Sequence, residues 1–364
     1  MTSPRLDDRY AVADKFVTNT GIRAAAQRRV SPVVWNYLEC GTGDEVTLRA
    51  NSRVMDDLVF DTPLFAGIAN PDTSTRFLGH DLSFPALIAP FGGGEHLLDA
   101  AGHLATGRAA RDVGIRQIVP VAAAHSLEDI AATSGVAQMF QITFVGDTGA
   151  VLDMIARARD AGCEQVVATY SPILQWRERI MEDRFSFRAG DVDANFGPGK
   201  SDPAMLREQL AFTRPRWGWA EAAEVIGKSP LPVIVKGVLT PEDVHRSLGA
   251  GAAGLYVSNY GGRSIDRMTP ALSALPGVRA AAGPDVPVIF DSGIRRGSDI
   301  AAALALGADV VALGRAVGYG LAADGEAGAR RVLEILKREF WTTLGHLGCS
   351  SVADLGPQVF RPGI

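Results

Sequence analysis

The segment from Val288 to Val317 reads VIFDSGIRRGSDIAAALALGADVVALGRAV. Two short apolar runs, VIF and VVAL, flank the Ala-rich stretch GSDIAAALALGA. This middle stretch opens with the helix-start signal Ser-Asp and closes on a glycine, as many helices do. Short β-branched runs that alternate with helical stretches are typical of βα units around a parallel sheet. The segment therefore predicts a strand, a helix and a second, parallel strand.

The same alternation recurs along the chain from Pro85 onward. Two further helical stretches, TPEDVHRSLGAGA and TPALSALPGVRAAAG, open with Thr-Pro and close on glycine. The expected strands are ALIAP at Ala86, IRQIVP at Ile115, AQMFQI at Ala137, QVVAT at Gln165, VIVKG at Val233, GLYVSN at Gly254, VIFDSG at Val288 and VVALGR at Val310. Eight evenly spread βα units predict an α/β fold, a TIM (β/α)8 barrel that forms a single domain over residues 1–364. A doubly wound open sheet is the alternative, but no GxGxxG follows the first strand.

Two segments lie outside this repeat. Residues 1–80 form an expected N-terminal helical extension, in which Ser31-Pro32 starts the helix PVVWNYLE that carries Tyr37. Residues 182–219, after the fourth strand, are too long for an ordinary connection and include RAGDVDANFGPGKSDP. Their Gly, Asp and Pro content favours a lid loop, and we expect residues 191–201 to be mobile without ligand.

The composition excludes several classes of protein. The formal charge of −5 leaves no basic footprint for nucleic acid or for an anionic membrane. Cys40, Cys163 and Cys349 fit neither a zinc site nor a disulfide framework, so we expect no metal and a reducing compartment. The opening MTSPRLDDRYAVADKF lacks the basic and apolar regions of a signal peptide, and no run of eighteen apolar residues occurs. These features predict a soluble, cytoplasmic protein.

The expected strands end in polar residues. Active sites of such barrels lie at the C-terminal strand ends. These ends carry Pro90, Phe91 and Gly92 in APFGGG, then Gln141, Thr169, Lys236, Ser258, Asn259, Tyr260, Asp291, Ser292, Gly293, Arg295, Gly314 and Arg315. The last two loops are a common phosphate site, where Gly293 and Gly314 let backbone N–H groups approach an anion and arginines supply charge. The sequence therefore predicts a phosphate-bearing cofactor.

Lys236 narrows the choice of cofactor. Alone, a lysine at a strand end can be a structural ion pair. A cation beside the N1/C2 edge of an isoalloxazine stabilises the anionic reduced ring, and the phosphate site lies two strands away. The combination favours FMN.

Three stretches carry a resemblance to a known family. They are YLECGTGDEVTL from Tyr37, VKGVLTPEDVHRSLGAGAAGLYVSNYGGRSID from Val235 and the segment that runs from Val288 to Leu336. The chain resembles the FMN-dependent α-hydroxy acid oxidase/dehydrogenase family, which includes glycolate oxidase, lactate oxidase and mandelate dehydrogenase. The resemblance extends from the N-terminal helix to Leu355.

The resemblance implies roles for individual residues. Gln141, Thr169, Lys236 and Ser258 would contact the flavin ring, beside Pro90, Phe91 and Gly92. Ribityl and phosphate would be held by Asp291, Gly293, Arg295, Gly314 and Arg315. The substrate carboxylate would be bound by Tyr37, Arg177 and Arg263, with Thr143 near the substrate. The resemblance also implies a homo-oligomer, a tetramer or octamer, and O2 or another electron acceptor.

This chain departs from the family pattern at the base. The family's histidine in SNHG is here Tyr260, and the aspartate that holds it falls in ATYSPI, where only Tyr170 or Ser171 is available. Thr143 stands where a tyrosine is usual, and VPVAAA where a serine and a bulky aromatic residue are usual. A phenol is a poor base at neutral pH unless cations such as Arg263 or Lys236 lower its pKa.

These departures leave several functions open. The first is an FMN-dependent oxidoreductase that moves hydride from a 2-hydroxy acid, an amine or a related donor to flavin N5, with Tyr260, Arg263 and Lys236 as catalytic residues. The alternatives are a non-redox isomerase or lyase with Tyr260 as acid or base, and a silent flavoprotein in which Tyr260 only packs. His96 is the one candidate for a replacement base.

Overall fold

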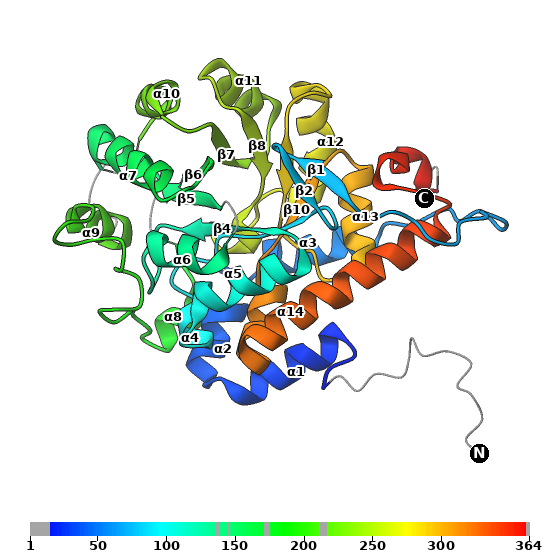
Figure 1. The fold of residues 1–364 in the computed structure, drawn as a ribbon, viewed down its shortest axis with the longest axis horizontal. Coiled ribbons are helices and arrows are strands. Elements are labelled where there is room, and N and C mark those ends of the chain that lie inside the picture. Colours follow the sequence, from blue (N-terminus) through cyan, green and yellow to red (C-terminus); the bar gives the residue numbers. More distant parts are fainter. Residues whose placement is uncertain (1–14, 136–137, 145, 171–174, 212–216, 362–364) are drawn as a thin grey trace.

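The computed structural model describes residues 15–135, 138–144, 146–170, 175–211 and 217–361. In these residues eight parallel strands close into a barrel in the order β10-β3-β4-β5-β6-β7-β8-β9 (Figure 1). Their bounds are Ala86–Ile88 (β3), Arg116–Pro120 (β4), Met139–Thr143 (β5), Gln165–Thr169 (β6), Val233–Val238 (β7), Gly254–Val257 (β8), Val288–Phe290 (β9) and Val310–Leu313 (β10). The eight strands expected from the sequence are confirmed, except that Ala137 lies outside the described residues.

Helices connect the barrel strands. They are Glu95–Leu98 (α4), Gly102–Val113 (α5), Leu127–Ser134 (α6), Thr148–Asp160 (α7), Trp219–Lys228 (α10), Pro241–Gly249 (α11), Ala271–Ala282 (α12), Gly297–Ala305 (α13) and Arg315–His346 (α14). The Thr-Pro signal at Thr240 acts as expected, since the Thr240 side chain accepts a hydrogen bond from Asp243 N at the start of α11. At the Ser-Asp start of α13, the carboxylate of Asp299 accepts hydrogen bonds from Arg295 N and Arg296 N at 2.7 and 2.9 Å.

Strand register brings polar residues to one level of the barrel. Thr143 pairs with Thr169 between β5 and β6, and Thr169 pairs with Lys236 between β6 and β7. Lys236 in turn pairs with Tyr256 on β8. Because neighbouring parallel strands are in this register, residues far apart in the chain line the same rim.

The interior of the barrel is apolar. Its buried side chains come from all eight strands and include Leu87, Ile118, Met139, Val167, Ile234, Tyr256, Ile289 and Val310. The antiparallel pair Thr75–Phe77 (β1) and His80–Leu82 (β2) adds Phe77 and Leu82 to this core. Layers of branched side chains make such a barrel a packed core and not a pore, which leaves the strand ends for a site.

The N-terminal extension contains Asn19–Arg29 (α1), Pro32–Glu39 (α2) and Val46–Asp56 (α3). Helix α1 lies along the long helix α14, as Figure 1 shows at the lower edge of the barrel. Ser31 caps α2 by accepting from Val34 N, and Pro32 occupies its first turn, as expected. This arrangement holds Tyr37 of α2 against the barrel.

Between β6 and β7 lie Glu178–Glu182 (α8), which ends where the expected insertion begins, and Pro203–Ala211 (α9) within it. Residues 171–174 and 212–216 lie outside the described residues. Within 191–201, Val192 and Asn195 are buried, and Ala194 N bonds to Ala123 O at 3.1 Å. The segment is thus in contact with the barrel, and its expected mobility without ligand stays a prediction.

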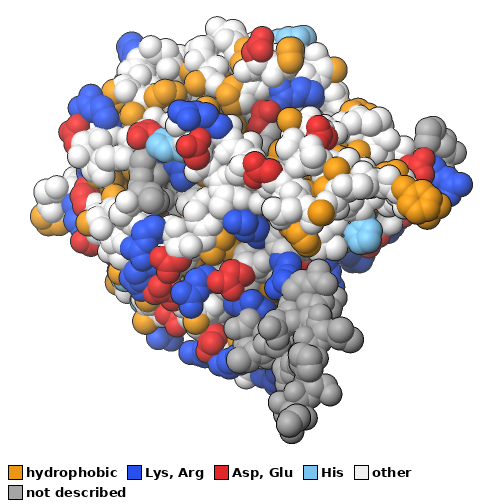
Figure 2. All heavy atoms as spheres, turned by 45° about the vertical axis from the view of Figure 1, so that its right-hand side comes forward, with side chains coloured by type: hydrophobic (Ala, Val, Ile, Leu, Met, Phe, Trp, Pro, Cys, Tyr) orange, Lys and Arg blue, Asp and Glu red, His pale blue; other side chains and the backbone are white. Residues whose placement is uncertain are grey.

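Three observations concern membranes, surface charge and metal ions. None of the described helices is long and apolar enough to cross a membrane. On the face in Figure 2, Lys and Arg side chains are intermingled with Asp and Glu, so that face carries no broad patch of one sign. In the described part of the chain, no group of three or more His, Cys, Asp or Glu side chains could hold a metal ion.

Candidate active site

A cavity of about 680 Å³ lies at the C-terminal ends of the barrel strands. It is lined by nearly all the site residues expected from the sequence: Tyr37, Pro90, Phe91, Gly92, Gln141, Thr143, Thr169, Arg177, Lys236, Tyr260, Arg263, Asp291, Gly293, Arg295, Gly314 and Arg315. Strand ends meet at one rim of a closed parallel barrel, which explains why sequence position predicted this set.

Other lining residues were not expected. Ala122 lies after β4 in VPVAAA, the stretch that departs from the family pattern. The others lie in the insertion and its neighbours: Gln175, Arg184, Phe185, Phe187, Val192 and Ser264. No strand ends at these positions, so the strand pattern gave no reason to choose them. The length of the insertion was the one available signal that this part of the chain covers the rim.

Lys236 and Asp291 form a buried ion pair in the cavity wall. Lys236 Nζ lies 2.9 Å from Asp291 Oδ2. Burial opposes the charge of Asp291, but the positive charge of Lys236 and hydroxyl donors outweigh it and hold its pKa below the ordinary value. Tyr256 Oη and Ser292 Oγ each donate to the carboxylate at 2.8 Å. Asp291 is therefore ionised, and its carboxylate oxygens already accept hydrogen bonds from neighbouring side chains. It is a poor acceptor for a substrate proton.

Ser258 does not line the cavity, contrary to the expectation that it contacts the flavin ring. Its side chain is fully buried, donates to Asp291 Oδ1 at 2.5 Å and accepts from Tyr260 N at 3.0 Å. Ser258 thus supports Asp291 and the turn after β8 from behind the wall.

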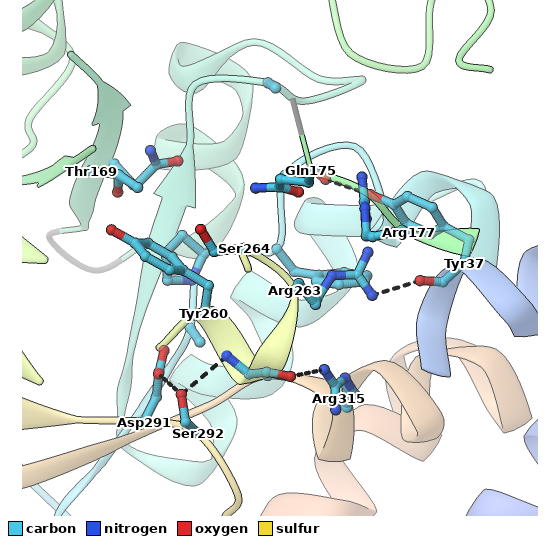
Figure 3. A pocket seen from close by; sticks show the side chains of 18 of the residues that line it. Tyr37, Thr169, Gln175, Arg177, Tyr260, Arg263, Ser264, Asp291, Ser292 and Arg315 are labelled. Atoms are coloured by element: carbon cyan, nitrogen blue, oxygen red, sulfur yellow. Dashed lines mark hydrogen bonds between the residues drawn. The ribbon is translucent and has the colours of Figure 1, made fainter. Parts of the chain in front are cut away.

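One end of the cavity is strongly cationic. Arg315 begins the first segment of α14, which is interrupted by non-helical backbone at Asp324 and Gly325, so its side chain and the helix N-terminus lie at the same point. Burial lowers the pKa of Arg315 to about 10, and the positive charges of Arg295 and Arg263 add to the effect. Arg315 donates to Gly261 O, and Gly261 N donates to Ser292 Oγ at 3.1 Å (Figure 3). Clustered cations at a helix N-terminus are suited to a bound anion.

Tyr37, Arg177 and Arg263 lie together on one side of the pocket (Figure 3). The guanidinium carbons of Arg177 and Arg263 lie 5.7 and 5.0 Å from the centre of the Tyr37 ring. Arg263 Nη1 donates to Tyr37 O at 2.7 Å, at the end of α2. Burial lowers the pKa of Arg177, and the charge of Arg263 lowers it further. The three residues expected to bind a carboxylate are therefore assembled.

Tyr260 lies across the pocket from this group, near Thr169 (Figure 3). Its φ is 58°, a left-handed conformation, in the turn Tyr260–Gly262 (η2). Its hydroxyl donates to Tyr170 O at 2.9 Å and lies 3.3 Å from Lys236 O. Burial, and after it the negative charge of Asp291, raise the pKa of Tyr260 above its ordinary value. The idea that Arg263 or Lys236 lowers this pKa is therefore wrong, and the phenol is a neutral donor.

Among the described residues of the cavity wall, no side chain replaces the missing pair of histidine and aspartate. Tyr170 contributes its backbone carbonyl to Tyr260, while Ser171 lies outside the described residues. His96, the one candidate for a replacement base, does not line the cavity; its Nδ1 lies 3.2 Å from Ala100 O. Among the described lining residues, Asp291 is the sole carboxylate and no histidine is present.

The residues present fit a flavin. Thr169 Oγ1 is buried at the wall and has no hydrogen-bond partner among the described residues. Gln141 Nε2 has a long contact of 3.4 Å to Thr143 Oγ1. A planar heteroaromatic ring with hydrogen-bonding edges would satisfy such groups, and a phosphate would balance Arg295 and Arg315.

Comparisons with known proteins agree with this arrangement. The model of the family described as FMN-dependent dehydrogenase matches residues 26–362. Glycolate oxidase 1 of Oryza sativa is 34% identical over 341 residues, 92% of each chain. The 4-hydroxymandelate oxidase of Amycolatopsis orientalis is 33% identical over 344 residues, 93% of this chain and 96% of the relative. A structure of mandelate oxidase with (S)-4-hydroxymandelic acid superposes with a TM-score of 0.86 at 32% identity, covering 95% of this chain and 98% of that one.

Proposed function

The chain belongs to the FMN-dependent dehydrogenase family and is an FMN-dependent oxidoreductase, and we propose that it oxidises a small carboxylate-bearing donor without a side-chain base at Tyr260. The observation that carries the proposal is the opposition of two groups across one cavity. Tyr37, Arg177 and Arg263 form a cationic group suited to a carboxylate, while the hydroxyl of Tyr260, on the other side of the cavity, points away from them and is bonded to a backbone carbonyl (Figure 3).

The cofactor would be held along the rim. Arg295, Arg315 and the N-terminus of α14 would bind the phosphate of FMN, with Gly293 and Gly314 leaving room for it. Gln141, Thr169 and Lys236 would face the ring. FMN, when bound, supplies the acceptor for a hydride. Lys236 would stabilise negative charge there, and Asp291 would hold Lys236 in place.

The carboxylate would be fixed by Arg177 and Arg263. The two guanidinium groups lie against one aromatic ring, and Arg263 is anchored by the end of α2. A carboxylate would offset the mutual repulsion that lowers the pKa of Arg177. A donor bound there presents the carbon next to its carboxylate to the interior of the cavity.

The proton of the donor decides which compounds react well. A 2-hydroxy acid must lose its O–H proton as hydride leaves, and a positioned base contributes roughly a hundred- to ten-thousand-fold to such a step. A 2-amino acid first loses its ammonium proton to solvent, and the neutral amine then forms an iminium ion when hydride leaves carbon, so that step needs no side-chain base. The absence of a free carboxylate or histidine among the described lining residues favours 2-amino acids as the second candidate substrates.

An anaerobic titration of the yellow protein tests this function. Donors from a panel of 2-hydroxy and 2-amino acids should bleach the oxidised-flavin band near about 450 nm. Arg177→Leu should keep the flavin and lose the bleaching, because only the carboxylate site is removed. If dithionite bleaches the protein but no donor does, the isomerase, lyase or silent-flavoprotein alternatives replace this proposal.

The proposal also covers the electron acceptor, the oligomeric state and the cellular compartment. The relatives are named oxidases, which supports O2 as the electron acceptor. Leu64 and Phe65 are 86% and 93% exposed, and adjacent apolar side chains of this kind support a homo-oligomer, for which the proposed size is a tetramer or octamer. Cys40, Cys163 and Cys349 are buried and free, which supports a reducing compartment such as the cytoplasm. Light scattering coupled to size exclusion measures the oligomeric state, and a monomeric mass would contradict it.

A further inference from the structure

Asn195 is a fully buried residue of the insertion. Its Nδ2 donates to Val121 O at 2.9 Å, just after β4, and its Oδ1 accepts from Leu127 N at 2.9 Å, at the start of α6. Arg157 of α7 adds a longer contact of 3.4 Å from Nη2 to Oδ1. One amide side chain therefore connects the insertion to three elements of the barrel.

The backbone around Asn195 is held as well. Arg157 Nη1 donates to Asn195 O at 2.7 Å, and Arg157 Nε lies 2.6 Å from Glu128 Oε1. Ala194 N donates to Ala123 O at 3.1 Å. The segment is thus attached at one point by both its side chain and its main chain.

Three residues before Asn195, Val192 enters the cavity wall. Val192 is buried and packs with Ala122, Leu206 and Phe187 in one apolar cluster. Val192, Phe187 and Ala122 all line the cavity. We call Phe187 and Val192 the outer wall.

The outer wall also packs closely against the loop after β3. A Cβ built on Gly93 would lie 2.6 Å from the Phe187 ring and 2.7 Å from Val192. Gly93 has a φ of +69°, which glycine adopts without strain. The glycine therefore lets the outer wall approach the loop that carries Gly92 of the cavity.

The outer wall touches the carboxylate site. The Tyr37 ring lies 5.5 Å from the Phe187 ring in an edge-on arrangement, and 4.9 Å from Phe185. A donor held by Arg177 and Arg263 would therefore place its substituent against the outer wall. The position of Phe187 and Val192 sets how much space that substituent has.

We infer that Asn195 is a positioning residue that fixes the outer wall and thereby determines which substituents beside the carboxylate are accepted. The inference rests on the proposed function, since it requires a carboxylate at Tyr37, Arg177 and Arg263. Asn195 acts through Val192 and Phe187 and touches neither donor nor cofactor.

The test compares two carboxylates that carry no oxidisable group, acetate and phenylacetate. Each is titrated into the FMN-bound protein and followed by the change in flavin absorbance. In Asn195→Ala we expect phenylacetate to bind about tenfold more weakly and acetate to change less than about threefold, because apolar contacts with the outer wall are lost. FMN content should equal that of the wild type. Equal weakening of both probes would overturn the inference.

Further variants distinguish a positioning role of Asn195 from a general loss of folding stability. Asn195→Asp keeps the volume and the acceptor for Leu127 N but places a carboxylate oxygen against Val121 O, and should show a change of the same kind that is at least as large. Val192→Ala trims the outer wall itself and should reproduce the selectivity loss even if Asn195→Ala does not fold. Val244→Ala, buried on α11 away from the cavity, is the matched control and should change neither probe.

A second measurement does not depend on the proposed function. Limited proteolysis of residues 185–201 should be at least about tenfold faster in Asn195→Ala, since local opening costs less when buried hydrogen bonds are lost. An unchanged cleavage rate overturns the inference. If the wild type binds neither carboxylate, the proposed function fails, and the part of the inference that concerns selectivity fails with it. The proteolysis still tests whether Asn195 holds residues 185–201 in place.

Discussion

The hydroxyl of Tyr260 donates a hydrogen bond to the carbonyl oxygen of Tyr170 at 2.9 Å. The bond joins the turn after β8 to the end of β6 on one side of the cavity. A Cβ on Gly237 would lie 2.2 Å from the same hydroxyl, so the phenol occupies space that only a glycine leaves. The hydroxyl of Tyr260 donates its hydrogen bond to a carbonyl oxygen, and burial raises its pKa. Tyr260 is therefore a neutral group in the cavity wall.

Tyr260→Phe tests this role. The change removes the bond to Tyr170 O, which should cost about 1 kcal/mol of the free energy of unfolding. Flavin reduction by the best donor should slow by less than about tenfold, far below the effect of losing a general base. Stopped-flow reduction and urea unfolding measure the two quantities. A loss of a hundredfold or more would show that the phenol exchanges protons.

Tyr260→His should introduce a base. Imidazole, with an ordinary pKa near about 6.5, can accept a proton at neutral pH, and His tolerates a left-handed φ better than most residues. We expect faster reduction of the flavin by lactate or mandelate than in the wild type, but partial activity, because no carboxylate orients the ring. Tyr260→Asn, which fits the same backbone without supplying a base, is the control. Equal rates in the two variants would count against the missing base as the cause.

Arg315→Ala should give largely colourless protein. The side chain supplies charge at the N-terminus of α14, where the FMN phosphate would bind, and its loss leaves Arg295 as the one arginine assigned to the phosphate. Absorbance of the purified protein measures the flavin content. Arg330→Ala, on the exposed part of the same helix, should stay yellow. A yellow Arg315→Ala protein would move the phosphate site elsewhere.

Glu95→Gln should change how stability depends on pH. Burial raises the pKa of Glu95 to about 8, so the folded protein holds a proton that the unfolded chain releases near its ordinary value of 4.5. Stability contributed by this group is complete below that ordinary value and is lost as pH rises to about 8, with a slope of about 1.4 kcal/mol per pH unit.

His103, whose Nε2 lies 3.8 Å from Glu95 Oε2, opposes this trend at lower pH. Burial lowers its pKa to about 4, so its contribution grows between about pH 4 and its ordinary value of 6.5. Between pH 6.5 and 8 the effect of Glu95 acts without this opposition, and the wild type should lose stability relative to Glu95→Gln. Urea unfolding at several pH values measures the difference, with exposed Glu224→Gln as control. A difference independent of pH would show that Glu95 is ionised in the folded protein.

The sequence determined the barrel and most of the cavity. Strands such as Val233–Val238 and Val288–Phe290 are short apolar runs whose period is local, so they can be recognised without their neighbours. A closed parallel barrel then brings every strand end to one rim, which is why Lys236, Asp291 and Arg315 were found from their places in the chain.

Tertiary structure decided where the side chains point and what they touch. Ser258 ends a strand like the others, but it turns to Asp291 behind the wall. Tyr260 could be an acid, a base or packing until its bond to Tyr170 O, ninety residues away, was seen. The Gly- and Asp-rich insertion pattern predicted a loop but not the burial of Asn195 against Val121. These outcomes depend on contacts between segments distant in sequence, and a local pattern carries no information about the partner that a side chain finds.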